Sequence, residues 1–104
     1  MKELKLMTKL NKIEIANEIL DSYGTKCKLS ASDATNATAL HYVCGLGKKE
    51  LALKIIKLGK NILDFNQKAT GNITYIAKCF TYQAKNAGMD EVILELLENG
   101  EKPG

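Results

Sequence analysis

The 104-residue chain contains no arginine and no tryptophan, and only one proline and one histidine. Because all fifteen basic residues are lysines, the chain lacks the guanidinium fork that reads guanine edges and phosphates, which disfavours a nucleic-acid reader. The single proline, Pro103, leaves the preceding chain free to form helices. No apolar run approaches the roughly 18 residues of a membrane-spanning helix, so we expect no membrane insertion.

Cysteine and histidine are too few and too widely spaced to predict a metal site. Cys27, Cys44 and Cys79 form no Cys-x-x-Cys pair, and only His41 is available to join them, whereas structural zinc needs four ligands. We therefore expect no metal, no cofactor and three reduced thiols in an intracellular, cytoplasmic protein. The N-terminus, MKELKLMTKLNK, lacks the continuous apolar stretch of a secretory signal.

An apolar pattern recurs three times along the chain. The segments NKIEIANEILDSYG (11–24), GKKELALKIIKLG (47–59) and GMDEVILELLENG (88–100) all carry apolar residues at i, i+1, i+4 and i+5. This spacing places the apolar side chains on one stripe of an α-helix. The stripes are Ile15, Ala16, Ile19 and Leu20; Leu51, Ala52, Ile55 and Ile56; and Val92, Ile93, Leu96 and Leu97. We expect Gly24, Gly59 and Gly100 to end these helices in a left-handed conformation.

Each of these outer helices is expected to follow an inner helix. The inner helices are predicted at 2–10, 38–46 and 74–87, and the first would bury Leu4, Met7, Leu6 and Leu10. Polar stretches rich in Asp, Asn, Ser, Thr and Gly separate the helix pairs, as is typical of turns. One pair cannot bury its own apolar stripe, so the pairs must stack into a common core.

The segment DATNATALHYVCGLGKKELALKIIKLGKNI (33–62) resembles one repeat of the ankyrin family. The family pattern runs from an aspartate through T-P-L-H-x-A to a glycine, an apolar helix and a closing glycine. Matching positions hold Asp33, Thr38, Leu40, His41, Val43, Gly47 and Gly59. Ala39 replaces the usual proline and Asn36 the usual glycine. The spacing from Asp33 to Asn66 equals the ankyrin period of about 33 residues.

The other two repeats match the family less closely. In the third repeat, Thr74 and Cys79 fit the pattern and Gly88 and Gly100 enclose the outer helix, but five residues are inserted within FTYQAKNA. The first repeat lacks the signature and resembles an N-terminal cap. The resemblance thus predicts an all-α ankyrin-repeat solenoid of stacked antiparallel helix pairs joined by protruding turns. Its single domain, 1–104, would comprise a capping repeat (1–32), a second repeat (33–65) and a third repeat (66–104) with an insertion near 80–87.

The resemblance also implies a function. Ankyrin domains usually bind partner proteins through their turn tips and the concave surface of their inner helices. The corresponding candidate contact residues are Ala34, Thr35, Leu46, Phe65, Gln67, Lys68, Phe80 and Tyr82. We therefore expect a monomeric, non-enzymatic protein–protein interaction module.

Two alternatives remain open for the function. The chain would instead be a regulatory or targeting segment of a larger multidomain protein, whether or not that protein is an enzyme. The tail ENGEKPG favours this alternative weakly, because it reads like a closing glycine that enters another turn; if the chain is complete, we expect this tail to be frayed. A lysine-rich nucleic-acid binder is the second alternative, and it predicts steeply salt-dependent binding.

Several residues admit a chemical role, but a structural role is favoured for each. The resemblance implies that Thr38 and His41 hydrogen-bond around the start of the inner helix, rather than forming a nucleophile and its base. Cys44 and Cys79 are expected to pack as small apolar residues, whereas Cys27, in a polar turn, would be exposed and oxidisable. The acidic run and the lysine run are interpreted as solvated helix faces. These runs are Asp90, Glu91, Glu95, Glu98 and Glu101, and Lys48, Lys49, Lys54, Lys57 and Lys60.

The insertion leaves two interpretations equally open. Phe80, Tyr82 and Gln83 would lie near the concave rim, where aromatic side chains suit protein contact. The insertion would otherwise be a longer inner helix whose aromatic residues merely cap the end of the array.

Overall fold

A computed structural model describes residues 2–102, and over that range the chain is mostly helical and has no β-strand. The helices are α1 (Lys2–Lys9), α2 (Ile13–Tyr23), η1 (Gly24–Lys26), α3 (Ala39–Leu46), α4 (Lys49–Leu58), α5 (Tyr75–Lys78) and α6 (Asp90–Glu98). The predicted all-α class is therefore confirmed. No helix within these residues is both long and apolar enough to cross a membrane.

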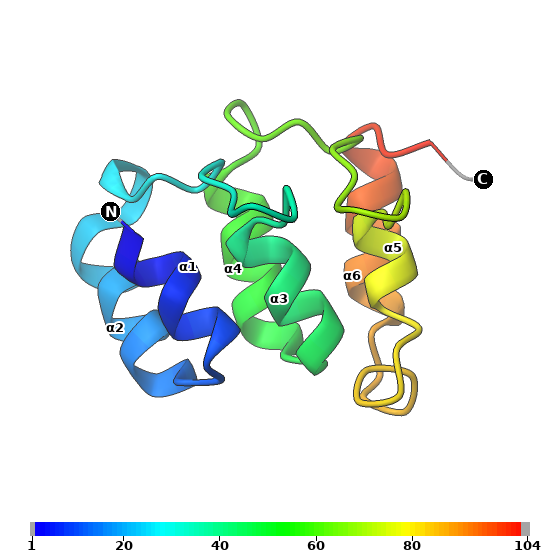
Figure 1. The fold of residues 1–104 in the computed structure, drawn as a ribbon, viewed down its shortest axis with the longest axis horizontal. Helices are drawn as coiled ribbons and strands as arrows, with labels where there is room; N and C mark the ends of the chain where they lie inside the picture. The colour runs from blue at the N-terminus through cyan, green and yellow to red at the C-terminus, as the bar shows by residue number, and fades with distance from the viewer. Residues whose placement is uncertain (1, 103–104) are drawn as a thin grey trace.

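The helices form antiparallel pairs that stand side by side along the chain (Figure 1). The pairs are α1 with α2, α3 with α4, and α5 with α6. The helices α1, α3 and α5 pack in one row, which we call the inner row. The helices α2, α4 and α6 pack in a second row, the outer row. The long turns that join successive pairs all lie at one end of the helices (Figure 1).

The core runs through the stack as one cluster of buried residues. In α4 the whole predicted stripe is buried: Leu51, Ala52, Ile55 and Ile56. Burying a Leu or Ile side chain contributes about 1.5–3 kcal/mol, so this helix alone supplies much of the stability of the middle pair. The middle pair has neighbours on both sides, which is why its stripe is completely covered.

The stripes of the end pairs are only half covered, contrary to prediction. In α2, Ala16 and Leu20 are buried but Ile15 is 48% exposed; in α6, Leu96 is buried but Leu97 is 39% exposed. Leu6 and Leu10, predicted to be buried in the first helix, are exposed as well. Within residues 2–102 each end pair packs against a neighbouring pair on one side, so part of its apolar surface meets solvent.

The turns around the middle pair use glycine in two different ways. Gly47 ends α3 in the left-handed region, with φ of 72°, and its N–H reaches the carbonyl of Cys44. Gly24 and Gly100 have positive φ as predicted, but Gly59 does not: its φ is −92°. Glycine at position 59 leaves room for Leu63, because a Cβ atom there would lie 2.5 Å from Cδ1 of Leu63 and would force that side chain to shift.

The third inner helix is much shorter than predicted. Instead of extending from 74 to 87, α5 ends at Lys78, and turns occupy the following residues. The Thr81 hydroxyl donates to the carbonyl of Gly45 at 2.7 Å, and Ala84 is fully buried, so this segment is packed against α3. The interpretation of the insertion as a longer inner helix is therefore wrong.

Candidate binding surface

Thr38 and His41 close the first turn of α3 by reciprocal hydrogen bonds. The backbone N–H of Thr38 donates to Nδ1 of His41 at 3.0 Å, and the backbone N–H of His41 donates to the Thr38 hydroxyl at 3.4 Å. This is a capping box with histidine in the place of the usual glutamate or glutamine. Thr74 caps α5 in a simpler way, since its hydroxyl accepts from the N–H of Ala77.

His41 is buried and lies under the next helix pair. Its ring stacks on Tyr75 of α5 with ring centroids 4.0 Å apart, and Nε2 has no hydrogen-bond partner within the described residues. Burial lowers the pKa of His41 to about 4, and the nearby Lys78 lowers it too, whereas the carbonyls of Gln67 and Ile73 raise it. The imidazole is consequently neutral at pH 7, and it joins two pairs rather than facing a substrate.

All three cysteines are buried, including the one predicted to be exposed. The turn after η1 folds back on α2, so Sγ of Cys27 lies 3.7 Å from the carbonyl oxygen of Ile19. Burial raises the pKa of the Cys27 thiol. The interaction with Cys79, together with complete burial, raises the pKa of Cys44 well above its ordinary value. The surroundings of Cys27 and Cys44 therefore oppose thiolate formation at these two thiols.

The turn before α3 is organised by Asp33. Oδ1 of its carboxylate accepts hydrogen bonds from the N–H and hydroxyl of Thr35 and from the N–H of Ala37, and Oδ2 accepts from the Tyr42 hydroxyl. The hydroxyls of Thr35 and Tyr42 hold the pKa of Asp33 well below its usual range. An antiparallel bridge between Ser32 and Thr38 closes the turn.

Two successive turns hydrogen-bond to each other and form a continuous edge, the turn edge (residues 32–38 and 67–73). The Asn36 side chain donates to the carbonyl of Lys68 at 2.9 Å, and Gln67 donates back to the carbonyl of Asn36 at 3.1 Å. The N–H of Thr70 donates to the carbonyl of Thr35 at 2.8 Å. Asn36 has φ of 59°, the left-handed conformation that asparagine tolerates.

The C-terminal segment is held in the same manner as far as the structure describes it. Asn66 donates from its amide to the carbonyl of Gly100 at 3.0 Å and accepts from the N–H of Lys102 at 2.9 Å. Glu101, expected on a solvated face, is only 3% exposed, and its Oε2 accepts from the N–H of Ile76. Burial raises the pKa of Glu101. Residues 100–102 are thus held by hydrogen bonds and are not frayed. Fraying was expected only if the chain is complete, and Pro103 and Gly104 lie outside the described residues.

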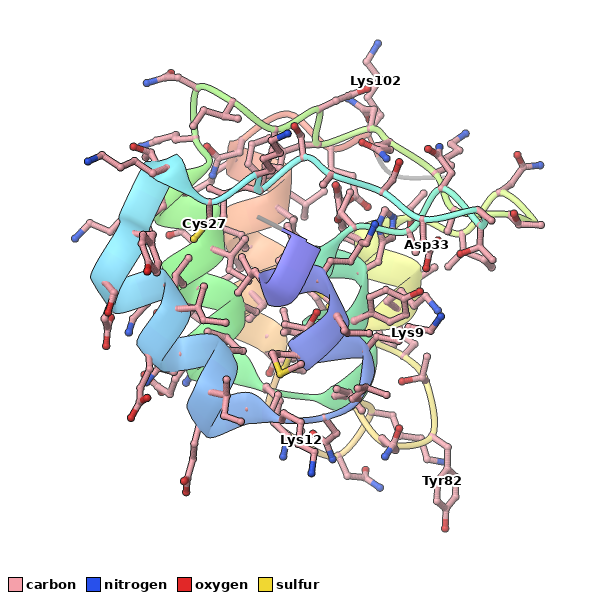
Figure 2. All side chains as sticks on the ribbon, turned by 60° about the vertical axis from the view of Figure 1, so that its left-hand side comes forward. Lys9, Lys12, Cys27, Asp33, Tyr82 and Lys102 are labelled. Atoms are coloured by element: carbon pink, nitrogen blue, oxygen red, sulfur yellow. The ribbon has the colours of Figure 1, made fainter. Side chains whose placement is uncertain are left out.

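The predicted contact residues divide into exposed and buried ones. Tyr82 is 87% exposed and points away from the body of the molecule (Figure 2), and Phe80 is 63% exposed. Phe65, in contrast, is only 5% exposed, because its ring packs edge-on against Tyr75 with centroids 6.4 Å apart. Phe65 is therefore a core residue. The remaining candidates lie on the turn edge and at the end of α3: Ala34, Thr35 and Lys68 are exposed, and Leu46 and Gln67 are half-buried.

A shallow hollow of about 200 Å³ lies on the inner row, and sequence reasoning had missed two of its residues. Lys9 of α1 and Lys78 of α5 line it together with α3 and the start of the 80–87 segment. The Lys78 stem crosses α3, since its Cδ lies 3.4 Å from the position of a Cβ on Gly45. The sequence feature that could have indicated these two lysines is the near absence of acidic residues from the inner helices. The hollow is lined by Lys9, His41, Tyr42, Gly45, Leu46, Lys78, Thr81 and Gln83.

Comparison with known proteins finds no match among protein-family models, curated proteins or solved structures. Within residues 2–102, no group of three or more His, Cys, Asp or Glu side chains is arranged to hold a metal ion. The chemistry of the surface must therefore be inferred from its own residues.

Proposed function

We propose that this chain is a small ankyrin-type repeat module that binds another protein and performs no catalysis of its own. Three features support the ankyrin-type assignment: the stacked antiparallel pairs, the spacing of the turns, and the Thr38–His41 cap under the next pair. The non-catalytic assignment is supported by the positions of the three side chains that could have formed a nucleophile and its base. Thr38, His41 and Cys44 are buried and take part in capping and packing.

The exposed aromatic pair in the 80–87 segment carries the proposal of protein binding. Phe80 and Tyr82 leave large apolar surfaces in water beside the inner-row hollow, although Thr81 between them is fixed to α3. Nζ of Lys85 lies over the Tyr82 ring, 5.2 Å from its centroid. Exposed aromatic side chains held on a fixed backbone are typical of residues that dominate binding energy.

A pull-down with matched variants tests this function. The parent chain and a Phe80→Ser/Tyr82→Ser variant would be compared as baits in lysate of the source cells. A Leu94→Ser/Ile62→Ser variant is the control, because these side chains are also exposed but belong to α6 and to the turn after α4. We expect partners recovered by the parent and by the control to be lost by the Phe80/Tyr82 variant. Equal recovery by all three baits would count against the proposed surface.

A second candidate, a module within a longer stack, is favoured by the open side of α5 and α6. An apolar groove of about 430 Å³ lies there, lined in part by Ile76, Ile93 and Leu97. The corresponding residues of the middle pair, Leu40, Ala52 and Ile56, are buried. Fusing a capping helix pair after residue 104 should then raise the melting temperature, because stacked repeats stabilise one another through their interfaces. An unchanged melting temperature would argue against this candidate.

A further inference from the structure

We infer that the inner face binds an acidic segment of the partner protein, one that carries at least one large apolar side chain. The inner face comprises the inner row, the turn edge and the 80–87 segment. This inference rests on the proposed protein-binding function and specifies the chemistry of the partner.

Charges are segregated between the two rows of helices. Of the twelve acidic residues, eight lie on the outer row, whereas α3 and α5 have none and α1 has only Glu3. The outer-row acids are Glu14, Glu18, Asp21, Glu50, Asp90, Glu91, Glu95 and Glu98. A net charge of +3 thus understates how positive the inner face is.

Lysines approach the inner-row hollow from both sides. Lys9 comes from α1 and Lys78 from α5, and the α3 surface lies between them. Lys68 on the turn edge and Lys85 in the 80–87 segment add further positive charge to the same face. The nearest acid of the turn edge, Asp33, already accepts hydrogen bonds from neighbouring residues through both oxygens.

Lys9 and Lys78 differ in their partners from two lysines of the outer row, Lys49 and Lys54. Lys54 pairs with Asp21 at 2.6 Å and Lys49 with Glu91 at 3.3 Å, and both pairs connect outer helices. Among the side chains that the structure describes, Lys9 and Lys78 form no such pair. A ligand carboxylate would therefore meet lysines that need not give up an existing ion pair.

The hollow between the lysines specifies the rest of the ligand. Gly45 and Leu46 contribute apolar surface, and the exposed rings of Phe80 and Tyr82 lie in the adjoining segment. An aliphatic or aromatic side chain fits this surface, with carboxylates on either side reaching the lysines. Charge complementarity of this kind chiefly increases the association rate and the selectivity.

The alternative to ligand binding is that Lys9 and Lys78 only stabilise the ends of their helices. Lys9 and Lys78 lie in the last turns of α1 and α5, where cations interact favourably with the helix dipole. Under that role, replacing them would lower the melting temperature and leave ligand binding unchanged. Melting curves of every variant therefore belong to the test.

Selection of random linear peptides displayed on phage against the immobilised parent chain tests the inference. We expect the enriched peptides to be acidic and to contain a large apolar residue. A synthesised, fluorescein-labelled enriched peptide should bind at least tenfold more weakly to a Lys9→Glu/Lys78→Glu variant in anisotropy titrations. A Lys57→Glu/Lys60→Glu variant is the matched control, because these lysines lie on the outer side, and its affinity should equal that of the parent.

The other outcomes separate this inference from the proposed function. Enriched peptides without acidic character that still need Phe80 and Tyr82 would overturn the acidic partner and leave protein binding standing. No enrichment, or equal binding to both lysine variants, would overturn the inference, and the pull-down would then decide the proposed function. Tighter binding of a 12-nucleotide single strand than of any peptide, lost in the Lys9/Lys78 variant, would overturn it in favour of nucleic acid.

Discussion

Acidification should destabilise this protein through His41. The ring is fully buried, its Nδ1 accepts from Thr38, and its pKa is lowered to about 4. A histidine with a lowered folded-state pKa takes up a proton more readily when unfolded, so stability is lost as the pH falls from about 6.5 towards 4. From these two pKa values, the loss between pH 7 and pH 5 is about 2 kcal/mol.

Two carboxylates with shifted pKa values, Glu101 and Asp33, also make stability depend on pH. Burial raises the pKa of Glu101, so the folded state binds a proton more readily there and gains stability on acidification. The pKa of Asp33 is lowered, so its contribution is lost only below the ordinary range of aspartate, near pH 4. The Glu101 contribution therefore opposes that of His41, and the His41 contribution must be isolated by a variant.

A His41→Gln variant isolates that contribution. Glutamine at this position preserves the capping-box pattern but does not titrate, and the variant keeps Glu101 and Asp33. Urea unfolding of both proteins would be measured at intervals from pH 7 to pH 5. We expect the free energy of unfolding to fall by about 2 kcal/mol more in the parent than in the variant. Parallel pH profiles would refute the reasoning, because they would mean that folded His41 takes up protons as readily as the unfolded chain.

Three further predictions follow from burial and backbone geometry. Leu96→Ala should lower the free energy of unfolding, measured in urea, by about 2–5 kcal/mol, and Leu97→Ala should lower it by less than about 1 kcal/mol. The two differ because Leu96 is fully buried and Leu97 is exposed. Gly47→Ala should lower the free energy of unfolding more than Gly88→Ala does. Both glycines have φ of 72°, but the new methyl group at position 47 would lie 2.8 Å from Cβ of Ala87. Equal losses within either pair would contradict these assignments. A thiol reagent should label the three cysteines rapidly only after unfolding, whereas rapid labelling of Cys27 in the native state would show that it is exposed.

The middle pair was predicted well from the sequence, because its neighbours on both sides enforce the apolar pattern, although its closing Gly59 is not left-handed as expected. Its apolar stripe and the Thr38–His41 cap both depend on residues within one repeat. The interaction of Thr38 with His41 is local, and it was expected from the resemblance of this segment to an ankyrin repeat. The half-exposed stripes of the end pairs were mispredicted, since identical patterns are covered or uncovered according to what lies beside them.

Three further errors concern side chains whose surroundings come from distant parts of the chain. Phe65 and Cys27 lie in polar turns, yet the turns fold back and bury them against Tyr75 and α2. Glu101 continues an exposed acidic helix, yet it turns inward to the N–H of Ile76, 25 residues earlier. Composition of the local segment indicates exposure in all three cases. Only the packing of one pair on another reverses that indication.

The same packing explains where a binding site can lie on this molecule. Polar side chains of the turns fix one turn on the next: the Asn36 side chain is hydrogen-bonded to Lys68, and the Asn66 side chain to Gly100 and Lys102. Once these backbones are fixed, the outward-facing side chains are not needed for the fold. Tyr82 and Lys9 can therefore be replaced at little cost in stability, since exposed surface substitutions usually change it by less than about 0.5 kcal/mol. If replacing a side chain alters partner capture but leaves the stability unchanged, that side chain belongs to the binding site.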